Sequence, residues 1–166
     1  RAKDLIIRSG HNIDPLMIEN AMATHPAVAL AAAVGMPDAY AGELPVCFVA
    51  LRPGARATED ELHDHARQAI AERPAWPKQI HVVEAIPLTS VGKIYKPALR
   101  CEAAARLVQR VLHEQHGLPA AQVQAQEGGR RGLRVRVTLA AAAREQQPAV
   151  EQALAAYLFE AEVVLA

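Results

Sequence analysis

The chain has 166 residues, enough to bury a hydrophobic core as one domain, or as one domain with a small appendage. Its 18 basic residues balance 18 acidic ones, which removes the electrostatic argument for a nucleic-acid or polyanion surface. Alanine supplies much of the 51% hydrophobic fraction, and no apolar run approaches the ~20 residues that a membrane span requires. These features predict a soluble protein.

A tight β-hairpin is predicted at the start of the chain. Residues 5–7 are an apolar, β-rich run and residues 9–12 favour a turn, with Gly10 at the tip. Asp14 can cap the helix that follows, because Pro15 suits the first helical position.

A short sheet is predicted in the middle of the chain. Residues 28–34 and 45–51 are apolar runs that suit buried strands, and residues 80–83 form a third. A helix lies between the second and third strands, since Thr58 and Glu61 have the spacing of a capping box.

No metal site or disulfide is predicted. Cys47 and Cys101 lie far apart and lack metal-ligand spacing, which indicates two reduced thiols in a cytoplasmic protein. His63 and His65 lie two positions apart on the predicted helix and cannot share a metal as an i, i+4 pair would. A solvated helix face is the better interpretation.

The sequence pattern after residue 120 predicts a second small unit. Residues 122–126 and 133–139 alternate apolar with polar side chains, which is typical of a hairpin with one solvated face. A helix with Tyr157 and Leu158 on its apolar side and a strand at residues 162–165 follow. The predicted order of this unit is β-β-α-β, and the whole chain is an α+β protein.

The cluster of four arginines in this second unit has two possible interpretations. These arginines are Arg130, Arg131, Arg134 and Arg136. A solvated strand face is favoured because the chain is neutral and no aromatic residues lie between them. Nucleic-acid binding is the alternative.

The segment at residues 86–100 contains the main candidate for chemistry. Pro87 and Gly92 bracket a short polar loop that carries Lys93, and Pro97 can begin the helix that follows. A lysine presented just ahead of a rigid helix suits delivery of a cation to an anion, and the alternative is a solvated surface lysine. A phosphate-binding P-loop is excluded, because its first glycine and its Ser or Thr are absent.

Residues 1–19 and 86–100, about ninety residues apart, together resemble the C-terminal domain of the adenylate-forming superfamily, which includes acyl- and aryl-CoA synthetases. The resemblance covers about residues 1–108. It implies a small mobile C-terminal domain with an N-terminal hairpin and a short sheet flanked by helices. Residues 109–166 are then an additional α+β tail unit.

The resemblance implies an AMP-forming acid–CoA ligase with ATP, AMP and coenzyme A as substrates. Lys93 matches the catalytic lysine for carboxylate adenylation, Lys3 matches the hinge, and Arg1 lies near the nucleotide. After domain rotation, the hairpin serves thioester formation. Ser9, Gly10 and His11 then lie along the pantetheine tunnel.

The sequence starts inside the first motif, and we interpret it as a fragment whose larger N-terminal part is absent. That part is expected to hold the acid pocket and Mg²⁺, so the fragment alone is expected to be inactive. The thiol acceptor is coenzyme A or, alternatively, the phosphopantetheine arm of a carrier protein. The tail suits a homodimer contact. The alternative from another class is a non-catalytic α+β interaction or ligand-sensing module.

Overall fold

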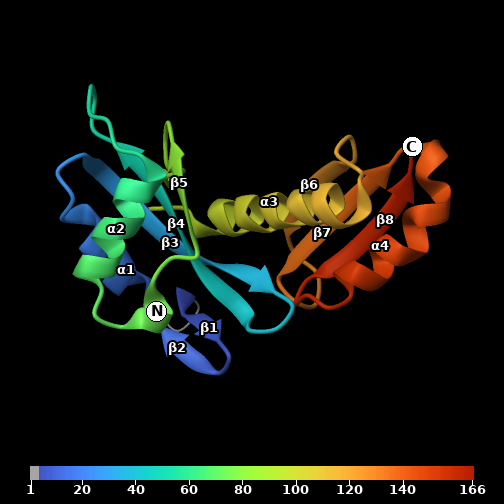
Figure 1. Ribbon diagram of the computed structural model, residues 1–166, viewed down its shortest axis with the longest axis horizontal. Coiled ribbons are helices and arrows are strands. Elements are labelled where there is room, and N and C mark those ends of the chain that lie inside the picture. The colour runs from blue at the N-terminus through green and yellow to red at the C-terminus, as the bar shows by residue number, and fades with distance from the viewer. Residues whose placement is uncertain (1–3) are drawn as a thin grey trace.

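Two β-sheets and one long helix between them form the architecture of the computed structural model, which describes residues 4–166 (Figure 1). The strands are β1 (Ile6–Arg8), β2 (His11–Ile13), β3 (Val28–Asp38), β4 (Gly42–Leu51), β5 (Gln79–Val83), β6 (Gln122–Glu127), β7 (Leu133–Leu139) and β8 (Glu160–Leu165). The helices are α1 (Pro15–Ala23), α2 (Glu59–Ala69), α3 (Lys96–His116) and α4 (Gln147–Leu154), with 3₁₀ turns η2 (Arg73–Ala75) and η3 (Ala141–Gln146). Arg1 and Lys3 lie outside the described residues.

The first sheet is built around β4. Strand β3 pairs with one edge of β4 in antiparallel register, while β1 and the parallel strand β5 pair with it as well. The ladder between β3 and β4 runs on to Asp38 and Gly42, so β3 is longer than the predicted strand at residues 28–34. Gly35 lies within this ladder opposite Pro45, and the carboxylate of Glu43 occupies the space where a Gly35 side chain would lie.

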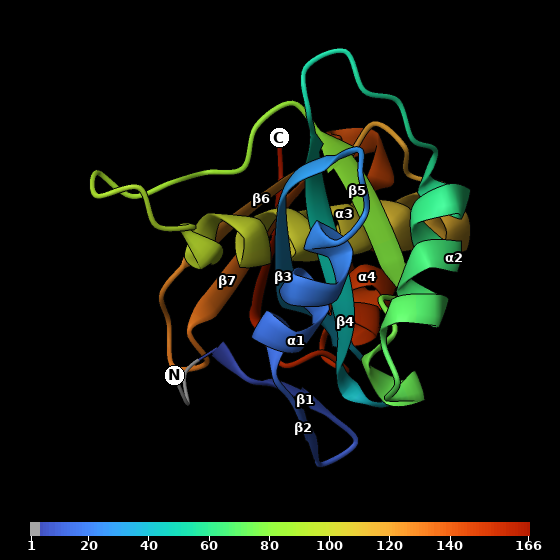
Figure 2. The ribbon, with the colours of Figure 1, turned by 90° about the vertical axis from the view of Figure 1, so that its left-hand side faces the viewer.

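Helices cover both faces of this sheet, as Figure 2 shows with α1 in front and α3 behind. Alternate residues of β3 and β4 point to opposite faces. One core joins Ala33 and Cys47 to α1, α2 and the hairpin. A second core joins Val34 and Phe48 to α3. The first unit is therefore a sheet with a core on each face.

The second sheet has the order β6-β7-β8, with β7 antiparallel to β6 and parallel to β8. Helix α4 connects β7 to β8, which confirms the predicted β-β-α-β order. The prediction of Tyr157 and Leu158 on the last helix was wrong, because α4 ends at Leu154 and Leu158 is 57% exposed.

Helix α3 contributes to the cores of both units. Leu107 and Val111 pack against the first sheet, while Val108 and Leu112 pack into the core of the second. The two pairs form adjacent stripes on the helix, since residues four apart share a face. The division of the chain at residue 108 stays a prediction, and α3 runs through that position.

The α+β class is confirmed by this arrangement. Within residues 4–166, no helix is both long enough and apolar enough to cross a bilayer.

Candidate functional site

Lys93 lies on a loop between β5 and α3 that forms a miniature hairpin. Leu88 and Ile94 form an isolated antiparallel bridge at its base. The backbone NH of Thr89 donates to the carbonyl of Lys93 (2.6 Å), and the Lys93 NH donates to the Thr89 hydroxyl (3.1 Å). Gly92, with φ 80°, makes the turn between them. The backbone of Lys93 is thus fixed on both sides while its side chain lies exposed.

A second lysine three positions later is held differently. The ammonium of Lys96 pairs with the carboxylate of Glu19 on α1 and also donates to the carbonyl of Ala33 (3.2 Å). The two charged side chains are only 15% and 13% exposed. No ion pair in residues 4–166 involves Lys93. Lys96 therefore joins α1, β3 and α3, and of these two lysines only Lys93 has a charge available to a ligand.

Two apolar side chains flank Lys93 and lie in solvent. Leu88 is 53% exposed and Val91 is 77% exposed. Neither contributes to a core of the described residues. A cation beside exposed apolar groups suits a loop that enters a largely dry cavity on another protein surface.

The β1–β2 hairpin carries the second group of predicted residues. Ser9 and Gly10 form its turn, with φ angles of 49° and 79°, and no heavy atom lies within 4 Å of a Cβ built on Gly10. The Ser9 NH donates to the carbonyl of Ala41 (2.7 Å), which fixes the hairpin to the turn between β3 and β4. His11 lies 3.6 Å from the carboxylate of Glu72. The hairpin tip is therefore open but anchored.

The lysine loop and the hairpin point away from the domain in different directions. In Figure 2 the yellow-green loop before α3 projects to the left, and the dark-blue hairpin projects downward. The structure does not bring Lys93 together with Ser9, Gly10 and His11 in one site. The predicted roles of Arg1 and Lys3 fall outside the described residues.

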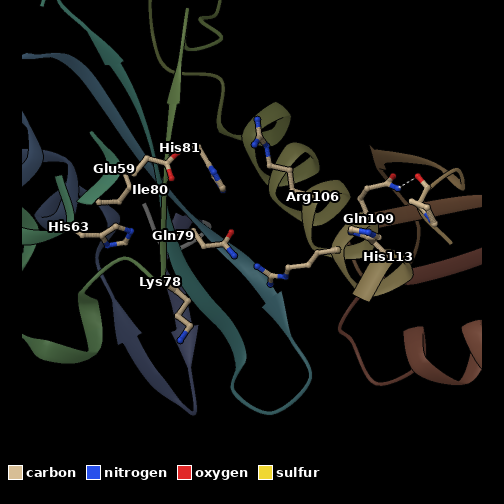
Figure 3. Close-up of a pocket in the computed structure, with 11 residues that line it drawn as sticks. Glu59, His63, Lys78, Gln79, Ile80, His81, Arg106, Gln109 and His113 are labelled. Atoms are coloured by element: carbon tan, nitrogen blue, oxygen red, sulfur yellow. Dashed lines mark hydrogen bonds between the residues drawn. The ribbon is translucent and has the colours of Figure 1, made fainter. Parts of the chain in front are cut away.

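A polar groove of about 610 Å³ lies on another side of the molecule, between the first sheet and α3. Figure 3 shows Lys78, Gln79 and His81 on one side of this groove and Arg106 and His113 on the other. Burial, followed by repulsion from Arg106, lowers the pKa of His81, which favours its neutral form. The Nε2 atom of His81 is buried and has no hydrogen-bond partner among the described residues.

Further hollows connect this groove with the hairpin. The hollow at the hairpin tip is lined by Arg8, Ser9, His11, Arg73 and Pro74. The next hollow shares Arg8 and Arg73 with it and reaches Lys78, which also lines the groove. Arg8 donates to the carbonyl of Pro74 (2.8 Å), which fixes its position. Arg8, Arg73 and Lys78 thus line a path that leads away from the hairpin tip, and Asp60 and Asp64 also line its middle hollow.

The surroundings of both cysteines disfavour the thiolate form. Burial, followed by the nearby charge of Glu19, raises the pKa of the Cys47 thiol to about 12. Burial, followed by Glu127, also raises the pKa of Cys101. Within residues 4–166, no three His, Cys, Asp or Glu side chains are grouped so that they could hold a metal ion.

Some contacts around the lysine loop had no signal in the sequence. The pair of Lys96 and Glu19 joins residues 77 positions apart. The Tyr95 hydroxyl donates to the carboxylate of Glu127 in the second unit (2.8 Å), across 32 positions. Local spacing reports neighbours on one element, so neither contact was predictable from it.

One protein-family model matches the part of the chain that runs from α1 to Lys93. Residues 17–93 match the model of the AMP-binding enzyme C-terminal domain. The match ends at Lys93 and begins after the hairpin, so it leaves the second unit outside.

Two curated relatives are named as a CoA ligase and an acetyl-coenzyme A synthetase. Marinolic acid–CoA ligase of a Pseudoalteromonas species is 49% identical over 112 residues, which are 68% of this chain and 17% of that protein. Acetyl-coenzyme A synthetase of Pyrobaculum arsenaticum is 42% identical over 106 residues, which are 62% of this chain and 16% of that protein. The matched segment is thus about a sixth of each curated relative.

Two solved structures of acyl-CoA synthetases are also similar to part of this chain. A fatty acyl CoA synthetase of Mycobacterium tuberculosis has a TM-score of 0.59 and 33% identity, over 64% of this chain and 21% of that one. An acyl-CoA synthetase of Brucella canis has a TM-score of 0.57 and 40% identity, over 62% of this chain and 19% of that one.

Proposed function

Because residues 17–93 belong to the family of AMP-binding enzyme C-terminal domains, we propose that this chain is the C-terminal part of an AMP-forming acid–CoA ligase in which Lys93 is the catalytic cation. The observation that carries the proposal is the lysine loop. Its backbone is held by hydrogen bonds on both sides of Lys93, while the ammonium group remains available. A preorganised loop can deliver this charge with little reorganisation.

The first half-reaction needs such a charge. A carboxylate oxygen attacks the α-phosphorus of ATP, an acyl adenylate forms, and pyrophosphate leaves. Two anions approach each other in this step, so a lysine between them lowers the barrier. The exposed side chains of Leu88 and Val91 support insertion of the loop into a cavity of the remaining enzyme.

The second half-reaction uses the β1–β2 hairpin in place of the lysine loop. A thiol sulfur attacks the acyl carbon of the adenylate, the thioester forms, and AMP leaves with the electron pair of the broken bond. Rotation of the domain withdraws Lys93 and presents the hairpin with Ser9, Gly10 and His11. The different directions of the loop and the hairpin support this exchange, because one rigid body can present one of them at a time (Figure 2).

Coenzyme A is the acceptor that the surface beside the hairpin favours. Arg8 and Arg73 line the hollow at the hairpin tip, and Lys78 lies in the next one. Coenzyme A carries phosphate groups at the far end of its pantetheine arm, so cations at this place would bind them. The names of the matched relatives agree with this acceptor.

Two variants of the full-length ligase test the proposal in opposite half-reactions. Lys93→Ala should slow adenylation by about 10²–10³-fold, measured as acid-dependent exchange of pyrophosphate into ATP, and should spare thioester formation from supplied acyl adenylate. Lys78→Ala should leave adenylation intact and raise the KM for coenzyme A. Equal losses in both half-reactions for Lys93→Ala would contradict a catalytic role of Lys93.

A further inference from the structure

The base of the lysine loop is tied to the second unit by one hydrogen bond. Tyr95 closes the loop, since its backbone NH donates to the carbonyl of Pro87 (2.8 Å). Its side-chain hydroxyl donates to a carboxylate oxygen of Glu127 (2.8 Å). Tyr95 lies two positions after Lys93 and directly before α3. A shift of Glu127 would therefore be transmitted to the position of Lys93.

Glu127 is itself held in place. It is the last residue of β6 and pairs with Leu133 of β7. The turn between these strands is fixed to β8, because the backbone NH of Arg130 donates to the carboxylate of Glu160 (2.7 Å). The same carboxylate lies against Gly129, where any side chain would collide with it. The end of the sheet that carries Glu127 is thus attached to β8 through Arg130 and Glu160.

The second unit is seated firmly on the first. Arg131 donates to the carbonyl of Tyr157 (3.1 Å), and the ring of Tyr157 stacks on Phe159 with centroids 5.5 Å apart. Tyr157 also packs against the core that α3 forms with the first sheet. Leu158 approaches Gly42 at the start of β4. Besides the bond between Tyr95 and Glu127, the tail therefore contacts the first unit through Tyr157 and Leu158.

We propose that Glu127 is a positioning residue for adenylation: through the Tyr95 hydroxyl, the tail unit sets the geometry of the loop that carries Lys93. This inference rests on the proposed function of Lys93. It gives the tail a role in the first half-reaction only, because Lys93 is withdrawn in the second. A positioning contact matters in this step because small misplacement of a catalytic group is costly.

Hydrogen exchange on the 166-residue chain tests the structural part without any assumption about activity. The backbone NH groups of Thr89, Gly92, Lys93 and Tyr95 donate hydrogen bonds within the loop. Tyr95→Phe and Glu127→Ala should each speed exchange at these amides by about threefold to tenfold, the worth of one such hydrogen bond. Unchanged exchange in both variants would overturn the inference.

Arg136→Ala is the matched control for this measurement. Arg136 lies on β7 and pairs with Glu162 of β8 (2.9 Å), at an exposed position of the same sheet. This variant perturbs the tail without touching the bond between Tyr95 and Glu127. It should leave exchange in the lysine loop unchanged. An equal increase in Arg136→Ala would mean that general loosening of the tail is responsible, and would overturn a specific role of Glu127.

A double-mutant cycle in the full-length ligase tests the functional part. Tyr95→Phe and Glu127→Ala should each slow adenylation by about fivefold to tenfold, and the double variant should be no slower than either one. Glu127→Gln should recover most of the rate, because its amide oxygen can accept the bond. Thioester formation from supplied acyl adenylate should be unchanged in all four variants, whereas a merely structural defect would lower both half-reactions.

Each outcome of the two experiments is decisive. Faster exchange with unchanged adenylation would overturn the positioning role. Additive losses in the double variant would do the same, because the two residues would then act separately. If Lys93→Ala left adenylation intact while loop exchange still responded to Tyr95→Phe, the proposed function of Lys93 would fail and the physical link between tail and loop would stand.

Discussion

Gly10 is the residue at which backbone geometry and proposed chemistry can be separated most cleanly. Its φ of 79° lies in the left-handed region, which strains any L side chain. The space beside it is open, since no heavy atom lies within 4 Å of a built Cβ. A side chain at this position would meet no neighbour in the domain. It would extend from the hairpin tip, where the proposed pantetheine path lies.

Gly10→Leu should therefore block thioester formation and leave adenylation nearly intact in the full-length ligase. The backbone strain should lower the free energy of unfolding by only about 1 kcal/mol. The measurements are CoA thioester yield, pyrophosphate exchange and the melting temperature of the same variant. A parallel fall in all three would assign Gly10 to the turn alone.

Gly54 provides the matched control for this substitution. It lies in the loop after β4 with φ 75°, and its built Cβ also has no neighbour within 4 Å. Figures 1 and 2 place this loop at the opposite end of the first unit from the hairpin. Gly54→Leu should cost similar stability and retain both half-reactions. Loss of thioester formation in this variant too would show that backbone strain is sufficient to cause it.

At the scale of elements, the pair of Glu19 and Lys96 is the polar contact that joins the layers of the first unit. Glu19 lies on α1, Lys96 begins α3, and both contact Ala33 on β3 between the helices. Because both charged groups are largely buried, removal of one partner leaves an uncompensated charge behind. The pair therefore specifies how α1 and α3 lie relative to the sheet.

Lys96→Ala should lower the free energy of unfolding of the 166-residue chain by about 2–3 kcal/mol, as measured by urea unfolding. The double variant Glu19→Gln/Lys96→Met should recover part of this loss, since it removes both charges. Arg67→Ala is the control, because it breaks the exposed pair with Asp64 and should cost less than about 0.5 kcal/mol. A loss for Lys96→Ala as small as that of Arg67→Ala would refute the structural role.

Most elements could be predicted from the sequence because their ends carry local signals. Asp14 caps α1 by accepting from the Leu16 NH, and Thr58 forms the predicted capping box with Glu61. Gly117 ends α3 in the left-handed conformation. These signals act over a few positions, which is why they are readable in one chain.

The errors arose where tertiary contacts override such signals. The strand predicted at residues 28–34 is too short, since β3 continues through Gly35 and Pro37 to Asp38 in antiparallel pairing with β4. The candidate site shows the same limit. Lys93 was predicted from its motif, whereas the partners that hold its loop, Tyr95 and Glu127, meet only after the tail has folded.

At the scale of the whole molecule, α3 makes the two units mechanically dependent on each other. Leu107 on this helix belongs to the core of the first sheet, and Leu112 belongs to the core of the second. Separation of the units would expose one apolar stripe of the helix to water, which is unfavourable in proportion to its area. We therefore expect the tail to move with the domain in the proposed rotation, as the proposed link to the lysine loop requires.

A substitution deep in the tail tests this dependence through a probe in the first unit. Trp76, the only tryptophan of the chain, packs against the core of the first unit and donates to the carbonyl of Ile70 (2.9 Å). Leu154 is fully buried in the tail.

Leu154→Ala should lower the free energy of unfolding by about 2–4 kcal/mol and shift the urea midpoint of Trp76 fluorescence together with that of far-UV circular dichroism. Gln152→Ala, at an exposed position of the same helix, should shift either midpoint much less. An unchanged Trp76 midpoint beside an earlier transition in circular dichroism would mean that the units unfold separately. In that case α3 would act as a tether, and the tail could not set the position of the lysine loop.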